Sequence, residues 1–111
     1  MLNQVVLVGR VQAIPKVSET STGIKVAEML VEVERNYKNS QGVYDIDTIQ
    51  CTLWRGLADS ALEQCEVGTL VGIKGRLQAN HFENKEGHPI YYADVIAEKI
   101  SFLHANDVKT V

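Results

Sequence analysis

The sequence IQCTLWRGLADSALEQC, residues 49–65, contains the change of hydrophobic period that decides the fold. From 49 to 54, apolar and polar residues alternate, which is the period of a β-strand with one covered face. Beyond this point Leu57, Ala61 and Cys65 stand four positions apart, which is the period of a short helix. The stretch therefore predicts a strand that leads directly into a short helix.

Trp54, the only tryptophan of the chain, lies at the end of this strand pattern. Successive side chains of a strand point to opposite faces, so the indole should share an exposed polar face with Gln50 and Thr52. An exposed indole beside the cation Arg55 suits stacking on a nucleobase and contact with its phosphate. The pattern alone leaves open the alternative that the strand is covered on both faces and that Trp54 belongs to the core.

Strand patterns on both sides of this stretch complete the expected architecture. The expected strands cover residues 3–11, 24–35, 43–55, 69–82 and 90 to about 103, with polar turns at 18–23, 37–42 and 84–89. In the second strand the apolar positions change parity near Ala27 and Glu28, which predicts a β-bulge there. Three strands, a helix and two strands are the order of the OB-fold, an all-β, five-stranded Greek-key barrel with a helix between strands 3 and 4.

Length and composition indicate one small globular domain. The 111 residues suffice for a single core, which we expect over 1–103, with a flexible end at 104–111. The longest apolar run, residues 5–8, is too short to span a membrane, and no leader pattern precedes it, so we expect a cytoplasmic protein. Cys51 and Cys65 each lie on an apolar stripe, which predicts two reduced core thiols.

The net charge of −3 comes from a local excess of acidic residues. Asp59, Glu63 and Glu66 lie in a segment without a basic residue, and the rest of the chain has eleven acidic and eleven basic residues. An acidic segment can face away from a ligand while basic residues gather elsewhere. Net charge therefore does not exclude a nucleic-acid partner, but it predicts weaker and more salt-sensitive binding than a basic protein would show.

Two further aromatic residues lie among cations. The two groups are Tyr37 with Arg35 and Lys38, and Phe82 with Lys74 and Arg76. Rings spaced along a surface with cations between them favour a protein that binds single-stranded nucleic acid. Each feature also has a structural interpretation, because Tyr37 can be a turn residue, Phe82 can plug the end of a barrel, and a basic stripe can be a solvated face.

Enzymatic interpretations find little support in the sequence. Asp45 and Asp47 could share a metal ion, but their position in a hairpin is typical of solvated charges. His81, His88 and His104 have neither the mutual spacing of a zinc site nor a cysteine partner. We therefore expect no catalytic residues, no metal, no cofactor and no small-molecule substrate.

Four blocks of the sequence resemble bacterial single-stranded-DNA-binding proteins, in order and over residues 1–103. The blocks are NQVVLVGR at 3–10, CTLWR at 51–55, GTLVGIKGRL at 68–77 and FENKEG at 82–87. The resemblance implies an OB-fold homotetramer that binds unpaired DNA without sequence specificity during replication, recombination, repair or DNA uptake. It implies base-stacking roles for Tyr37, Trp54 and Phe82. It also implies contacts to the DNA backbone by Arg10, Arg35, Lys38, Arg55 and Arg76.

The chain departs from the family pattern at several places. Many members have an aromatic residue where this chain has Thr48. They have basic residues where it has Glu66 and Val67, and Arg or Lys where it has Gln78, Ala79 and Asn80. This chain therefore has one stacking surface and several cations fewer than those members, which predicts a lower affinity for DNA.

The sequence after residue 103 shows no acidic tip ending in phenylalanine, the element by which the principal members recruit other proteins. The chain thus resembles the short Gram-positive paralogues associated with DNA uptake, or a phage or plasmid version, although a truncated protein would look the same. Recruitment of replication proteins through such a tail is not expected. The rival hypothesis is an OB-fold adaptor that mainly binds proteins of a replication assembly.

Overall fold

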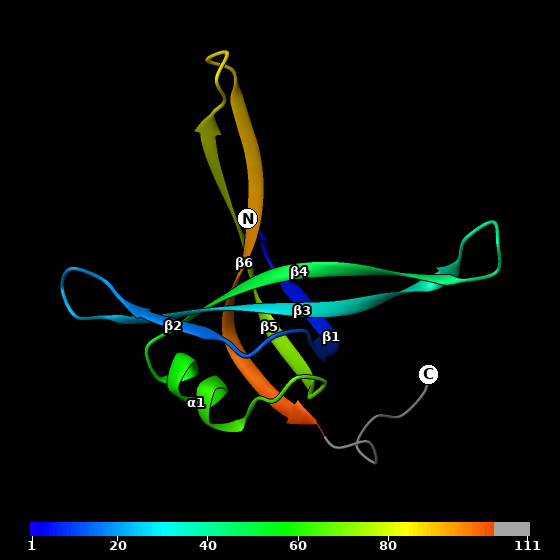
Figure 1. Ribbon diagram of the computed structural model, residues 1–111, viewed down its shortest axis with the longest axis horizontal. Helices are drawn as coiled ribbons and strands as arrows, with labels where there is room; N and C mark the ends of the chain where they lie inside the picture. Colours follow the sequence, from blue (N-terminus) through cyan, green and yellow to red (C-terminus); the bar gives the residue numbers. More distant parts are fainter. Residues whose placement is uncertain (104–111) are drawn as a thin grey trace.

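A computed structural model of the chain describes residues 1–103, so the flexible end expected at 104–111 lies outside the described residues (Figure 1). The elements are β1 (Val5–Val11), β2 (Lys16–Glu19), β3 (Lys25–Lys38), β4 (Tyr44–Trp54), α1 (Gly56–Gln64), β5 (Leu70–Glu83) and β6 (Pro89–Leu103). The all-β class with one short helix is confirmed. No helix within the described part of the chain is long and apolar enough to cross a membrane.

Five of the strands close into a barrel in the order β1-β5-β6-β4-β3, and β1 returns to pair with β3. Two short ladders complete the closure: Val11 lies opposite Val31 between β1 and β3, and Cys51 lies opposite Val95 between the parallel strands β4 and β6. The helix α1 connects the third and fourth barrel strands, β4 and β5. This arrangement confirms the predicted OB-fold.

The core of the barrel is apolar and contains both cysteines. Met29, Leu53 and Ile73 are among its largest fully buried side chains, and α1 adds two buried alanines. Cys51 and Cys65 are buried free thiols, as predicted. Burial raises the pKa of the Cys51 thiol to about 11, with a smaller contribution from the charge of Asp94.

The structure corrects the predicted bulge in β3. Its register against β4 is continuous from Val26 to Glu34, so no bulge occurs at Ala27 and Glu28. Ala27 lies on the core face and is fully buried, as are Met29 and Val31. The parity was misread because Ala27 was not counted among the core positions. The register shifts instead between Glu34 and Lys38, beyond the part of the strand that covers the core.

A second correction concerns the residues after Pro15. The sequence predicted a polar turn from 18 to 23, but Ser18 and Glu19 belong to β2, which pairs with β3. All four residues of β2 are exposed. A strand with no buried face lacks the alternation by which strands are recognised.

The exposed polar face predicted for β4 is only partly present. Thr52 is 9% exposed, because it lies opposite Ile96 in the short parallel ladder, where the strand is covered on both faces. Trp54 lies beyond that ladder and is 40% exposed. The indole is therefore directed outward, as predicted, but Thr52 is not.

The less regular alternation of β6 has its cause in a bulge. Lys74 pairs with Lys99 and the next residue, Gly75, pairs with Ala97, so β6 contains one extra residue. Gly75 is required at this place, because a Cβ atom there would lie 2.1 Å from the carbonyl oxygen of Ile96.

Two hairpins extend from the barrel in different directions, as Figure 1 shows. We call residues 34–47 the β3–β4 arm and residues 77–94 the β5–β6 arm. No residue of either arm is buried. The arms therefore present both faces of their strands to solvent and are free to contact a ligand.

Candidate nucleic-acid interface

The Trp54 site lies where β4 leaves the barrel and α1 begins. Trp54 is opposite Val26 on β3, and its indole is 40% exposed. Close to it, the Lys25 ammonium donates a hydrogen bond to Asp59 of α1 at 3.0 Å, and this carboxylate raises the pKa of Lys25. This ion pair links the start of β3 to α1, the two elements next to Trp54.

Arg55 follows Trp54 with an unusual backbone conformation. Its φ of 56° is the only positive value of a non-glycine residue in the part of the chain that the structure describes. The paired ψ of −123° is the conformation that glycine adopts at the first central position of a type II′ turn. An arginine is strained there, and such strain is concentrated at functional sites. The observation supports a functional role for this cation.

The β3–β4 arm presents aromatic rings on its two strands, next to an ordered loop. Tyr37 is 60% exposed, and the ammonium of Lys38 lies 5.7 Å from the centre of the Tyr44 ring. The side-chain oxygen of Asn39 accepts hydrogen bonds from two backbone N–H groups of the loop, those of Gln41 and Val43. Local bonds therefore order this loop, and the flat face of Tyr37 remains accessible.

Arg35 is not a free cation in this arm. Its guanidinium donates two hydrogen bonds to Asp47, at 2.9 and 3.0 Å, and lies 3.6 Å from Asp45. The hydrogen bonds and the charge of Asp47 are the main cause that raises the pKa of Arg35. In turn, Arg35 lowers the pKa of Asp47. Any contact of Arg35 with a phosphate must therefore compete with a carboxylate that is already bound.

The β5–β6 arm has an aromatic pair on each face. The rings of Phe82 and Tyr92 lie 6.1 Å apart with an interplanar angle of 53°. On the opposite face His81 and Tyr91 lie 5.7 Å apart at 41°. Phe82 is 54% exposed, so it does not plug the barrel.

Sequence reasoning missed both tyrosines of this arm. A signal was available, because the turn predicted at 84–89 places the flanking strands in register. That register sets Asn80 opposite Tyr92 and His81 opposite Tyr91. Counting outward from the turn would therefore have placed Tyr92 on the face of Phe82 and Tyr91 on the opposite face.

Lys74 and Phe82 do not lie together. They are eight positions apart on β5, which corresponds to about 26 Å of strand. Lys74 lies in the barrel opposite Val6 of β1, whereas Arg76 is nearer to the arm and donates a hydrogen bond to Gln78 at 3.0 Å.

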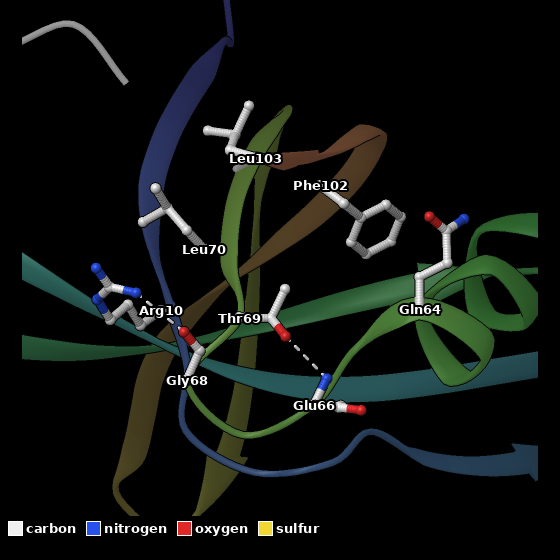
Figure 2. Close-up of a pocket in the computed structure, with 8 residues that line it drawn as sticks. All are labelled: Arg10, Gln64, Glu66, Gly68, Thr69, Leu70, Phe102 and Leu103. Atoms are coloured by element: carbon white, nitrogen blue, oxygen red, sulfur yellow. Dashed lines mark hydrogen bonds between the residues drawn. The ribbon is translucent and has the colours of Figure 1, made fainter. Parts of the chain in front are cut away.

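Arg10 lies at a hollow of about 590 Å³, away from the three exposed rings. Figure 2 shows its guanidinium directed at the carbonyl of Gly68, to which it donates a hydrogen bond at 3.0 Å. In the lining of this hollow, the backbone N–H of Glu66 donates a hydrogen bond to the Thr69 hydroxyl. The one aromatic ring in the lining, Phe102, is half-buried. The hollow thus offers hydrogen-bonding groups but no fully exposed ring.

The three predicted stacking residues are exposed but lie far apart. Trp54 is opposite Val26, and Tyr37 is eleven positions further along β3, which corresponds to about 36 Å. Phe82 lies in the other arm, seven positions or about 23 Å beyond Gly75 of the barrel. The rings therefore do not form one pocket. They mark an extended path over the surface, as a flexible polymer would require.

A five-stranded OB-fold barrel with outward aromatic rings on projecting hairpins defines a class: single-strand nucleic-acid-binding domains. Residues 2–103 match the model of the single-strand binding protein family. The chain belongs to this family.

Relatives with similar sequences include three from Gram-positive bacteria. Single-stranded DNA-binding protein B of Bacillus subtilis is 41% identical over 103 residues, which are 93% of this chain and 91% of the relative. Single-stranded DNA-binding protein 3 of Listeria innocua is 37% identical over 95% of this chain and 66% of its own length. Single-stranded DNA-binding protein 1 of Staphylococcus aureus is 36% identical over 98% of this chain and 65% of its own length. The chain thus spans about two thirds of the length of the latter two.

The predicted resemblance is confirmed by this membership. The prediction of a binding protein rather than an enzyme is confirmed as well, because single-strand binding defines the family. In residues 1–103 no group of three or more histidine, cysteine or acidic side chains could hold a metal ion.

Proposed function

We propose that this chain binds single-stranded DNA without sequence specificity, by stacking bases on Tyr37, Trp54 and Phe82 while basic residues contact phosphates. Every base has a flat face, so stacking on a protein ring does not depend on sequence. The function would be to protect unpaired DNA during replication, recombination, repair or uptake.

One observation carries the proposal: all three rings are at least 40% exposed on an OB-fold barrel whose core is complete without them. None of the three rings belongs to the core or packs against it, so stability does not explain their presence. Their exposure is explained if unstacked bases cover them. Family membership supports the same ligand.

The cations have unequal roles in this proposal. Lys38 and Arg55 adjoin the exposed rings in sequence and are assigned to phosphates beside Tyr37 and Trp54. Arg76 lies at the base of the β5–β6 arm and is assigned to the strand approaching Phe82. Arg10, Lys74 and Arg35 contribute less, because two lie away from the rings and the third is paired with Asp47.

Assembly as a homotetramer and action in the cytoplasm are part of the same proposal. The exposed apolar side chains Val6 and Val8 on β1 support self-association, because such a row is costly in water. Several subunits would join their surfaces into one long path for DNA, which raises affinity through multivalency. The domain proposed for this role covers residues 1–103.

The experiment is a titration of the purified chain with a fluorescently labelled oligo-dT, followed by anisotropy at several salt concentrations. We expect saturable binding, weak competition by duplex DNA of equal length, and a fall in log K of about 0.7 per phosphate contact for each tenfold rise in salt. Equal competition by duplex would contradict stacking on unpaired bases. Absence of binding at low salt would reject the proposal in favour of a protein-binding adaptor.

A further inference from the structure

We infer that Asp47, assisted by Asp45, limits the affinity of the β3–β4 arm for DNA by holding the Arg35 guanidinium in competition with phosphate. The inference rests on the proposed function, since it concerns how strongly the same surface binds DNA. We call the three residues the Arg35 clamp.

The geometry of the clamp is the first argument. Asp47 occupies two N–H donors of Arg35, Nε at 3.0 Å and Nη2 at 2.9 Å, one to each carboxylate oxygen. This is the two-pronged arrangement in which a guanidinium also binds a phosphate group. A phosphate approaching along that edge must therefore displace Asp47.

The second argument is the local charge. Arg35 also lies 3.6 Å from Asp45, and the carboxylate of Asp45 accepts a hydrogen bond from the Asn39 side chain at 3.2 Å. Two carboxylates around one guanidinium leave the clamp with a net charge of −1. The whole arm, residues 34–47, has three acidic and two basic residues. A polyanion approaching this arm meets repulsion at short range, in spite of the arginine.

The third argument is position. Arg35 is two residues from the exposed ring of Tyr37 along β3. A base stacked on Tyr37 brings its phosphates close to the clamp. The Arg35 and Asp47 side chains are 39% and 47% exposed, so DNA can reach them. Since Arg35 lowers the pKa of Asp47, the carboxylate is ionised and the clamp closed at neutral pH.

The test is the substitution Asp47→Asn, with binding to labelled oligo-dT measured over a range of salt concentrations. We expect affinity at low salt to rise about two- to fivefold, the scale of an exposed ion pair. The salt dependence should steepen by about 0.7 for the phosphate gained. The matched control is Glu63→Gln on α1, which changes the net charge equally at an exposed residue outside the arms and should leave the slope unchanged.

A second variant attributes the gain to Arg35. Adding Arg35→Ala to Asp47→Asn should abolish the gain in affinity and the steeper slope, because no guanidinium remains to be released. Unchanged or weaker binding by Asp47→Asn, or an equal gain in Glu63→Gln, would overturn the inference. Either result would leave the proposed function intact, provided that the unmodified chain binds oligo-dT. Failure of the unmodified chain to bind would reject the proposed function itself.

Discussion

In the barrel each strand has a face packed against the core, and Leu53, Ile73 and Val71 are inaccessible to solvent. In the two arms the same strands continue with both faces exposed, and the large side chains there, aromatic rings and several aliphatic residues, lie in water. The difference indicates that stability and binding are carried by separate sets of residues. Changes in the barrel should affect unfolding, and changes in the arms should affect DNA binding.

The largest expected effect comes from the same substitution made in each region. Leu53→Ala removes a fully buried side chain from the barrel and should lower the free energy of unfolding by about 2 to 5 kcal/mol. Leu77→Ala in the β5–β6 arm removes a side chain that is 47% exposed and should cost less than about 0.5 kcal/mol. Urea denaturation followed by circular dichroism measures both. Equal losses would show that the arm is as tightly packed as the barrel.

Alkaline pH should weaken the barrel through Cys51. Burial raises its pKa from the ordinary value of 9.0 to about 11 in the folded chain. The folded state therefore holds the thiol proton longer, so its stability is complete below the unfolded pKa and falls as pH rises towards 11. At 1.36 kcal/mol per pH unit the full loss is about 3 kcal/mol, of which about 2 kcal/mol falls between pH 8 and pH 10.5. Thermal midpoints at pH 8 and pH 10.5 measure it, and Cys51→Ala should flatten the dependence. A midpoint as pH-sensitive in Cys51→Ala as in the unmodified chain would exclude this thiol as the cause.

Removing an aromatic ring from an arm should weaken DNA binding and leave stability nearly unchanged. Phe82→Ala should weaken oligo-dT binding by about 1 to 3 kcal/mol, because one base loses its stacking surface. The thermal midpoint should change little, since the Phe82 ring is 54% exposed. The matched control is Ile90→Ala, which removes the apolar neighbour opposite Phe82 but no ring. If Ile90→Ala were to weaken binding as much, general apolar contact would explain the arm better than stacking.

A smaller effect is expected at the junction between barrel and helix. Arg55→Gly relieves a positive φ, which should stabilise the fold by about 1 kcal/mol, and it removes a cation beside Trp54, which should weaken DNA binding. Arg55→Ala, which keeps the strain and loses the charge, separates the two effects. The account would be wrong if Arg55→Gly lowered the thermal midpoint while binding stayed unchanged.

Most of the barrel could be predicted because it depends on burial. The period of apolar residues located the helix and four of the six strands to within about two residues of their observed bounds, while β3 extends three residues further and β2 was missed. The prediction failed where burial gives no signal. The exposed strand β2 has no alternation, and Ala27 is too small to mark the core face of β3. The burial of Thr52 depends on a strand 44 residues later in the sequence, which pairs it with Ile96.

The sequence predicted exposed rings in the candidate site, but it did not predict which charged side chains form ion pairs there. Aromatic residues stand out among polar neighbours, so the exposure of Tyr37, Trp54 and Phe82 could be predicted, although Tyr91 and Tyr92 were missed. Whether a cation is free depends on which side chain lies opposite, and the sequence does not show that Asp47 binds Arg35 across two strands. The partners of charged residues are fixed by register, and register requires the three-dimensional structure.

The emission of Trp54 during titration with unlabelled oligo-dT tests the central claim most directly. Because the chain has one tryptophan, the signal reports only on the indole at the end of β4. If bases stack on the outward rings, fluorescence should be quenched in a saturable way, weakly by duplex DNA and less as salt rises. Unchanged emission at concentrations where a labelled oligonucleotide is fully bound would contradict the claim, because DNA would then bind without contact to this ring.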